Sequence, residues 1–182
     1  MNKTTLRTST LFALLVGGTF AGHATANQVC LESIAETTPE SAFTVHGDGT
    51  VTQNEAGLMW RQCSLGQTFS NDSCTGSPTA INWQDALNAA DQSSFADHDD
   101  WRVPNLKELS GIIEFRCREP AINLEIFPNT PPSGSPDYWT STPLSVFSSS
   151  IWRVLFRDGA ISTGSSTTAS GRAVRLVRDV DD

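Results

Sequence analysis

The chain has 182 residues, with 12 Lys and Arg against 20 Asp and Glu, and a formal net charge of −8 at pH 7. This length fits a single domain, and a hydrophobic content of 38% is enough for a core, so wholesale disorder is excluded. The acidic balance also argues against a nucleic-acid-binding protein, because such proteins need a basic surface.

Residues 1–26 have the three parts of a secretory leader. Lys3 and Arg7 form a positive region, a short apolar stretch follows, and Ala24–Ala26 supplies an A-x-A cleavage site. The apolar stretch is shorter than the roughly 20 residues of a membrane-spanning helix, and no later segment could span a bilayer. We therefore expect a secreted or periplasmic protein whose mature chain is residues 27–182.

Charge is unevenly distributed along the mature chain. Removing the leader takes away two basic residues and leaves 10 basic against 20 acidic residues, a net charge of −10. Residues 27–137 hold 16 acids and five bases, whereas residues 138–178 hold one aspartate and five arginines: Arg153, Arg157, Arg172, Arg175 and Arg178. This segment either forms an anion-binding face or neutralises acids of the first part across the fold, and we favour neutralisation.

All four cysteines lie in the mature chain. An even count in an oxidising compartment predicts two disulfides. Cys63 and Cys74 flank a polar stretch with turn signals, so we pair them as a local clip, which leaves Cys30 to pair with Cys117. A zinc site is the disfavoured alternative, because no C-x-x-C pair exists and the two histidines of the mature chain are far apart.

The first part of the mature chain is predicted to contain a polar lead-in over residues 27–45 and a β-hairpin over residues 48–61. An amphipathic helix should follow Asn82, a good N-cap, because apolar residues then recur at helical spacing: Trp83, Ala86, Leu87 and Ala90.

A second helix is predicted to begin after Asn105, which has Glu108 at the spacing of a capping box. Its apolar face includes Leu109 and the two isoleucines that follow. We expect this helix to run to about Cys117, because Pro120 forbids its continuation.

The remainder is predicted to be loops and strands. Residues 128–136 are expected to form a rigid, exposed loop, and residues 138–142 a strand. Residues 151–157 should return through an Asp-Gly turn as a hairpin, and residues 172–178 should form a last strand with charges on both faces. Two central helices between strand-rich ends indicate one α+β domain.

An ordered set of motifs runs through the chain: GLMW (57–60), DWRVPNLKEL (100–109), YWTST (138–142), WRVLFRDG (152–159) and RAVRLVR (172–178). In this order they resemble a bacterial family of unknown function, named for the C-terminal domain of the Legionella collagen-like adhesin, over roughly residues 43–178. The WRVPN and RLVR pieces are also similar to the sulfatase-modifying-factor group. The resemblance implies a C-type-lectin-like single domain in residues 27–182, with antiparallel hairpins and long loops, in an exported or surface protein.

The adhesin's domain is associated with binding sulfated polysaccharides, but this chain departs from the adhesin in two ways. It has no collagen-like repeats, so no trimeric stalk is implied, and its oligomeric state is left open. Its mature net charge of −10 also disfavours sulfated glycans, because an acidic surface repels them. Only the arginines of residues 138–178 support that ligand class.

Catalytic motifs are missing from the sequence. There is no G-x-S-x-G elbow, P-loop or G-x-G-x-x-G. The formylglycine-generating enzymes of the related group use reactive cysteines late in the chain, and here no cysteine follows Cys117. We therefore expect no enzymatic activity. Asp97, Asp99 and Asp100 form an oxygen-rich cluster that could hold calcium, although we favour a solvated loop.

The candidate ligand-binding residues are tryptophans and arginines, because exposed tryptophan stacks on sugar rings and anchors interfaces. They are Trp60, Trp101, Trp139, Arg153 and Arg157. Burial of the tryptophans in the core is the alternative, which we favour. The sequence as a whole predicts a non-enzymatic, exported recognition or adhesion domain that binds a glycan or surface ligand through loops. The alternative is an interaction subunit that docks onto another exported protein; an enzyme is the third choice.

Overall fold

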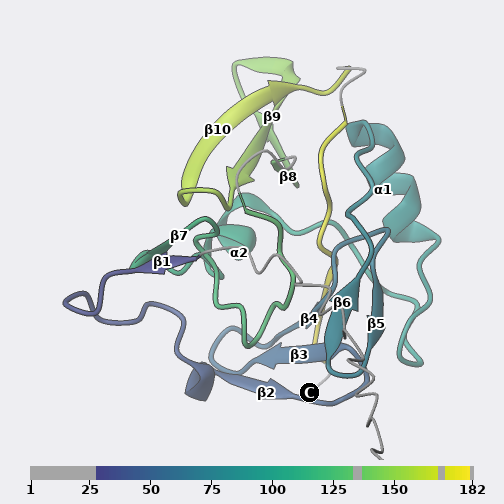
Figure 1. Cartoon of the computed structure of the whole chain (residues 1–182). Coiled ribbons are helices and arrows are strands. Elements are labelled where there is room, and N and C mark those ends of the chain that lie inside the picture. The colour runs from purple at the N-terminus through teal and green to yellow at the C-terminus, as the bar shows by residue number, and fades with distance from the viewer. Residues whose placement is uncertain (1–27, 133–136, 168–170, 181–182) are drawn as a thin grey trace, which may run out of the picture.

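The computed structural model describes residues 28–132, 137–167 and 171–180, and the predicted leader lies outside them. The strands are β1 (Val29–Cys30), β2 (Phe43–Val45), β3 (Thr50–Gln53), β4 (Leu58–Arg61), β5 (Thr68–Ser70), β6 (Ser73–Thr75), β7 (Cys117–Arg118), β8 (Tyr138–Leu144), β9 (Phe147–Leu155), β10 (Ala160–Ser165) and β11 (Val177–Asp179). The helices are α1 (Trp83–Asp91), α2 (Leu106–Ser110) and a short 3-10 helix, Glu40–Ala42 (Figure 1). None of the helices in these ranges is long and apolar enough to cross a membrane.

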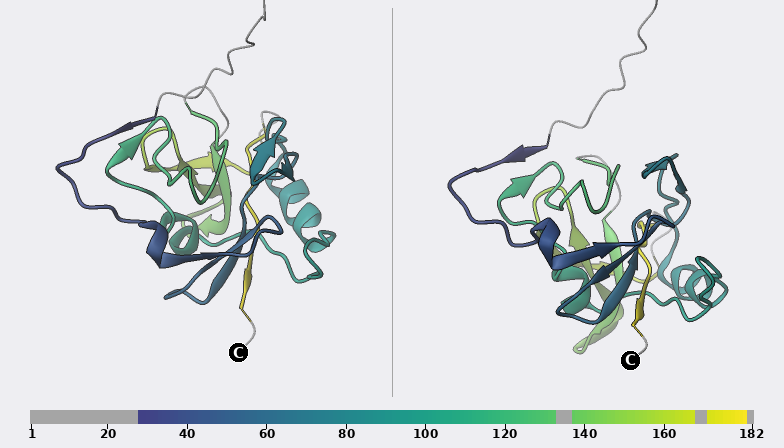
Figure 2. Two further views of the ribbon diagram at one scale, coloured as in Figure 1. Left: turned by 60° about the horizontal axis from the view of Figure 1, so that its bottom comes forward. Right: turned by 90° about the horizontal axis from the view of Figure 1, so that it is seen from below.

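All strand pairings between these elements are antiparallel. A four-stranded sheet has the order β11-β4-β3-β2, and a three-stranded sheet has the order β10-β9-β8. The predicted hairpins at β3–β4 and β9–β10 are confirmed. Figure 1 shows the three-stranded sheet at the top, the four-stranded sheet at the bottom and α2 between them. In both views of Figure 2, α1 lies on the opposite side of the molecule from the N-terminal segment. The mixed α+β class is therefore confirmed.

Both predicted helix starts are confirmed by their caps. The Asn82 side chain accepts a hydrogen bond from the Asp85 amide at 2.9 Å. Asn105 and Glu108 form the reciprocal capping box. The predicted end of the second helix is wrong, since α2 stops at Ser110.

Two core clusters hold the sheets and helices together. The larger one lies around α2 and both sheets, and includes Trp60, Phe127 and Tyr138. The smaller one joins α1 to β8 and β9 through residues such as Ala86 and Trp139. Burial of this apolar surface is the main stabilising contribution of the fold.

Two predictions about loops and strands are corrected by the structure. The proline-rich loop is not exposed throughout, because the Thr130 side chain is 1% exposed and its hydroxyl donates to the Phe127 carbonyl at 2.9 Å. Residues 133–136 of that loop lie outside the described residues. The last strand is shorter than predicted, since only Val177–Asp179 is a strand.

Both predicted disulfides are confirmed. Cys63 pairs with Cys74, and Cys30 pairs with Cys117. Cys30 and Cys117 are also register partners in the β1–β7 ladder. Disulfides of this kind are typical of proteins that fold in an oxidising compartment.

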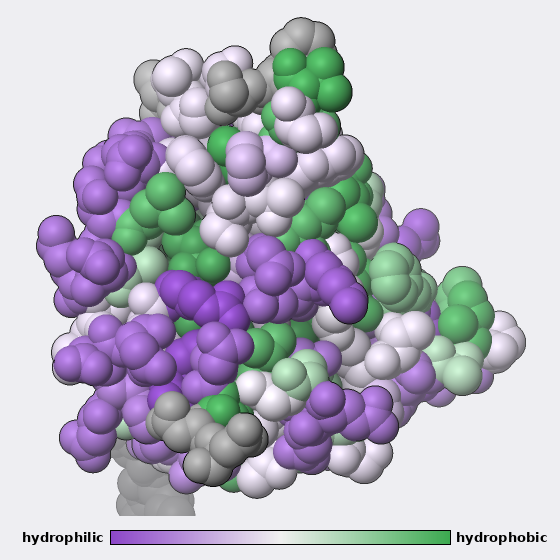
Figure 3. Space-filling view, turned by 180° about the vertical axis from the view of Figure 1, so that it is seen from behind, coloured by the Kyte–Doolittle hydropathy of each residue, from purple (hydrophilic) through white to green (hydrophobic). Residues whose placement is uncertain are grey.

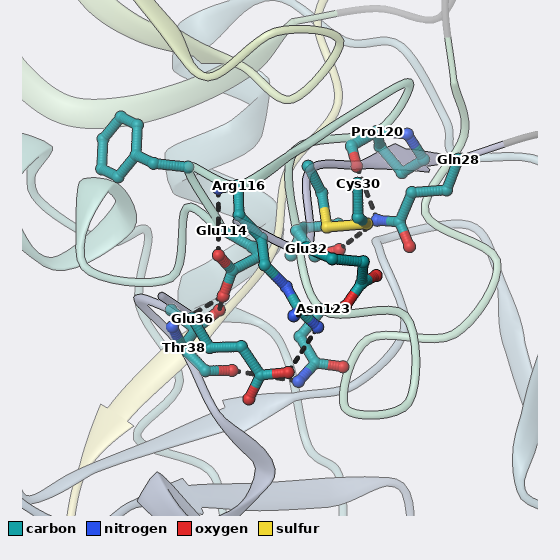
Figure 4. Close-up of a disulfide and its surroundings, with 12 residues drawn as sticks. Gln28, Cys30, Glu32, Glu36, Thr38, Glu114, Arg116, Pro120 and Asn123 are labelled. Carbon is teal, nitrogen blue, oxygen red and sulfur yellow. Dashed lines mark hydrogen bonds and ion pairs between the residues drawn. A yellow bond between two sulfur atoms is a disulfide. The ribbon is translucent and has the colours of Figure 1, made fainter. Parts of the chain in front are cut away.

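The disulfide at Cys30 fastens an N-terminal strap, residues 28–38, to the body of the domain (Figure 4). At one end, the Gln28 side-chain amide donates to the carbonyls of Pro120 and Ile122, both at 2.7 Å. At the other end, the Glu114 carboxylate accepts the Thr38 amide and hydroxyl, at 2.8 and 2.9 Å. The Glu114 side chain is therefore the anchor of the far end of the strap.

We expect this anchor to weaken at acidic pH. Burial by itself would raise the pKa of Glu114, but hydrogen bonds from the amides of Thr38, Thr37 and Arg116 lower it below the ordinary 4.5. A carboxyl with a lowered folded-state pKa stabilises the fold above its unfolded-state pKa, and this stabilisation is lost as the pH falls through the folded-state pKa. Hydrogen exchange at Thr37 and Thr38 should accordingly become faster, relative to core amides, below pH 4.5.

Glu114→Gln provides the control for this prediction. The amide side chain cannot ionise over this range, so the excess exchange between about pH 6 and about pH 3.5 should disappear in the variant. An identical pH dependence in the wild type and the variant would contradict the assignment of the anchor to Glu114.

Candidate functional site

The three tryptophans predicted to contact ligand lie in the core. Trp60 and Trp139 are 0% exposed and Trp101 is 3% exposed. Each indole N–H has an internal acceptor, respectively the Gln53 side chain, the Ile81 carbonyl and the Phe95 carbonyl, at 2.9–3.2 Å. Trp60 and Trp139 therefore offer no face to a ligand, which agrees with the favoured interpretation that they are core residues and corrects their candidacy as binding residues.

The arginines of residues 138–178 mostly neutralise acids, as the favoured interpretation predicts. Arg153 and Arg172 both contact Asp137, and Arg178 donates to Asp100 at 2.7 Å. Arg157 is exposed but pairs with its neighbour Asp158 at 2.7 Å. The candidate ligand-binding residues Arg153 and Arg157 are thus both engaged by carboxylates.

Arg175 has a different environment. Its side chain is fully buried, and its guanidinium donates to the Gln62 carbonyl and, at 2.8 Å, to the Thr130 hydroxyl. The guanidinium carbon also lies 4.7 Å from the centre of the Phe127 ring. Burial lowers the pKa of Arg175 below its ordinary value. This residue is part of the core and is not accessible to ligand.

The candidate calcium residues Asp97, Asp99 and Asp100 lie in one exposed loop. The Asp100 carboxylate is drawn to Arg178, which lowers the pKa of Asp100. Within the ranges that the structure describes, no three His, Cys, Asp or Glu side chains converge on a point that could hold a metal ion. The favoured interpretation, a solvated loop, agrees with the exposure of all three aspartates.

A groove between α1 and α2 is the best candidate for a binding site, and we call it the α1–α2 groove. Its volume is about 390 Å³, and it is lined by Leu87, Ala90, Asp91, Trp101, Arg102, Val103, Asn105, Glu108 and Ser141. These residues come from α1, from the segment that leads into α2, from α2 itself, which contributes Glu108, and from β8. β8 and the segment before α2 are joined where the Ser141 amide donates to the Pro104 carbonyl at 2.8 Å.

The floor of the groove is apolar and its rim is polar. Leu87, half-buried on α1, lies at helical spacing from the exposed Asp91 at the end of that helix. Asp91, Asn105 and Ser141 place a carboxylate, an amide and a hydroxyl around the apolar floor. A concave apolar surface with a few polar groups is the usual composition of a small-ligand site.

Arg102 forms one wall of the groove and is held by two carboxylates. Its guanidinium makes a bidentate contact with Glu108, at 2.8 and 3.0 Å, and a further contact with Asp179 at 3.0 Å. Glu108, and to a smaller extent Asp179, raise the pKa of Arg102 above its ordinary value. The Arg102 backbone pairs with Val177, which brings Asp179 into reach.

A second groove of about 470 Å³ lies on the other side of this ion-pair network and shares Asn105 and Glu108 with the first. Lys107 and Asp179 also line it. The two grooves together contain more carboxylates than cations, so the arrangement suits an uncharged or weakly basic ligand better than an anion.

Sequence reasoning found part of this site. It identified Trp101 as a candidate and Asn105 and Glu108 as the capping residues of α2. It missed Leu87 as a binding residue, because an apolar residue at helical spacing is usually core. It also missed Asp91, which no motif includes, and Ser141, which lies in the YWTST motif (138–142) but was interpreted only as part of a strand.

Comparisons with known proteins identify the family. A comparison with curated proteins finds no match to the chain. The family model of the Lcl C-terminal domain matches residues 49–178, which is more than half of the chain and includes α1, α2 and both larger sheets except β2. The chain therefore belongs to the Lcl C-terminal domain family.

Proposed function

We propose that this protein is an exported, non-enzymatic recognition domain that binds a neutral glycan in the α1–α2 groove. The observation that carries the proposal is the groove itself, whose volume of about 390 Å³ is within the range of small-ligand sites. Its apolar floor can pack against the C–H face of a sugar ring. The carboxylate of Asp91, the amide of Asn105 and the hydroxyl of Ser141 can bond to the ring's hydroxyl groups.

The polarity of the surface supports a polar ligand. Figure 3 shows one face of the molecule, on which hydrophobic side chains form small patches framed by hydrophilic ones. The carboxylates Asp91, Glu108 and Asp179 outnumber the cations Arg102 and Lys107 at the two grooves, which disfavours a sulfated ligand. A C-type-lectin-like fold, which the family resemblance implies, would agree with this function.

As part of the same proposal, we infer that the protein is not an enzyme. A general acid or base is usually recognised by a pKa shifted toward neutrality in a cleft. Among the residues that the structure describes, four carboxylates have clear shifts, Asp48, Asp100, Glu114 and Asp158, and each has a lowered pKa and an internal hydrogen-bond partner. Such shifts are typical of structural hydrogen bonds and ion pairs.

A second candidate function is docking onto another exported protein. The observation in its favour is the exposure of Phe115, Leu31 and Ile34, at 60%, 55% and 43%, on or beside the strap. The Leu31 amide donates to the Arg116 carbonyl, so the β1–β7 pairing continues by one residue and Leu31 lies opposite Arg116, the neighbour of Phe115 in the chain.

A glycan array probed with the exported, oxidised protein tests the proposed function. We expect neutral glycans to be retained both in calcium and in EDTA. Asp91→Ala should weaken binding about tenfold, the loss of one hydrogen bond to a charged group. The variant should fold normally, because an acid at the C-terminal end of a helix is disfavoured by the helix dipole.

Asp99→Ala is the matched control, since it removes an exposed carboxylate outside the groove and should leave binding unchanged. Binding only to sulfated glycans, or binding abolished by EDTA, would contradict the proposal. A blank array would also overturn it. Retention of an exported protein that Leu31→Lys prevents and Asp91→Ala does not would establish the docking function instead.

A further inference from the structure

We propose that two copies of this chain associate through the outer edge of β10, so that their three-stranded sheets join into one antiparallel sheet. β10 is the edge strand of the sheet β10-β9-β8, and in Figure 1 no described element lies beyond it. This surface is separate from the residues of the α1–α2 groove, and the proposal does not rest on the proposed function.

The backbone of β10 has hydrogen-bonding groups available on this edge. The Ser166 amide donates to the Ser149 carbonyl at 2.8 Å, which continues the β9–β10 ladder by one residue. Amide groups of alternate residues in an antiparallel pair point to the same side. Ser162 and Gly164 therefore face β9, whereas the backbone groups of Ile161 and Thr163 point away from it. Within the described ranges, no hydrogen bond from another segment reaches the backbone of Ile161 or Thr163.

This edge lacks the features that usually prevent strand addition. Natural edge strands are commonly blocked by proline, or by lysine or another charged residue. β10, with the sequence AISTGS, has none of these, and its Ile161 side chain is 45% exposed. Such an edge can accept an extended strand, with main-chain hydrogen bonds supplying the affinity.

Charge and strand length together favour a second copy at this edge over the other edges. A protein with a net charge of −8 repels itself over most of its surface. β11 ends in Asp179, and β1 is followed closely by Glu32 and Glu36, so pairing there would bring carboxylates together. The edge strands β2, β5 and β6 are uncharged but have only three residues each, against six in β10, and β8 already uses its outer edge for hydrogen bonds to Ala173 and Pro104. β10 carries no charge, and two identical antiparallel strands pair with two-fold symmetry, the commonest symmetry of homodimers.

Sedimentation equilibrium of the exported, oxidised protein tests this proposal. We expect a reversible dimer with a dissociation constant on the order of 10–100 μM, because a single strand edge buries little surface. Ile161→Lys places two ammonium groups at the shared edge and should weaken the dimer at least about tenfold. Thr163→Pro removes an outward-pointing N–H, a position where edge strands tolerate proline, and should have the same effect.

Leu31→Lys is the matched control, because it makes the same kind of change at an exposed side chain of the strap, and it should leave the dimer intact. Hydrogen exchange at the amides of Ile161 and Thr163 should slow as the wild-type concentration rises. A wild-type protein that stays monomeric up to several hundred micromolar would overturn the proposal. So would a dimer that Ile161→Lys and Thr163→Pro leave unchanged.

Discussion

Replacing Arg175 with alanine is expected to lower the free energy of unfolding by about 3–5 kcal/mol. The change removes one of the largest fully buried side chains and leaves a cavity beside Phe127 and Tyr138. It also leaves the Gln62 carbonyl and the Thr130 hydroxyl without this donor in a site from which water is excluded. Both effects destabilise only the folded state.

The position of Arg175 explains why the loss should be large. Its neighbours in the chain are tied to the end of β4 and to the loop that follows it: the Arg61 amide donates to the Leu176 carbonyl, and the Leu65 amide to the Val174 carbonyl. The guanidinium connects this segment to the loop that contains Thr130. Arg175 therefore joins three segments: its own, the end of β4 with the loop that follows, and the loop that contains Thr130.

Urea unfolding measures the change, with Arg118→Ala as the matched control. Arg118 is exposed on β7, and its truncation should alter the free energy of unfolding by less than about 0.5 kcal/mol. Arg175→Lys should recover only part of the loss, because an ammonium cannot reproduce the planar donor geometry or the stacking on Phe127. A loss for Arg175→Ala as small as that for Arg118→Ala would contradict this account of the core.

Local sequence signals predicted the starts of elements better than their ends. Asn82 and Asn105 mark helix starts because a side-chain oxygen at the N-cap is satisfied within the next turn. The end of α2 was missed because the apolar pattern continues beyond it. Ile112 and Ile113 are buried as expected, but as part of a turn after Gly111. The spacing of apolar residues cannot distinguish a continued helix from a turn at this point.

The segment of residues 172–178 shows a second limit of pattern reading. Its alternating arginines and apolar residues predict a strand without saying which face is buried. The structure buries residues 173–178 on both sides and satisfies the arginines internally, through Asp100 for Arg178 and neutral oxygens for Arg175. Their partners lie far away in the sequence, so no local pattern could have named them.

Contacts between residues far apart in the sequence also explain why the candidate site was predicted only in part. The candidate tryptophans Trp60, Trp101 and Trp139 are buried, and each indole N–H is satisfied by an acceptor inside the fold. Of the three, Trp101 also lines the α1–α2 groove. The α1–α2 groove depends instead on where α1 packs against the segment leading into α2, and this packing is tertiary information that the sequence does not display.

The second large effect is expected on the free energy of unfolding when the Cys30–Cys117 disulfide, which holds the strap, is removed. Cys30→Ser with Cys117→Ser is expected to lower the free energy of unfolding by about 4–5 kcal/mol, because the bond closes a loop with a sequence separation of 87 in the unfolded chain. The same pair of changes at Cys63 and Cys74 opens a loop with a separation of only 11 and should cost about 3 kcal/mol.

The comparison of the two double variants by urea unfolding isolates loop length, since both remove one disulfide and add two hydroxyl groups. The family model begins at residue 49, so the strap and Cys30 lie outside the matched region while Cys117 lies within it. The long-range bond thus attaches a segment outside the matched residues to Cys117 within them, and the expected loss measures how strongly that attachment stabilises the whole fold. A larger loss at Cys63 and Cys74 than at Cys30 and Cys117 would show that the short bond, together with the β5–β6 hairpin it closes, carries more of the stability.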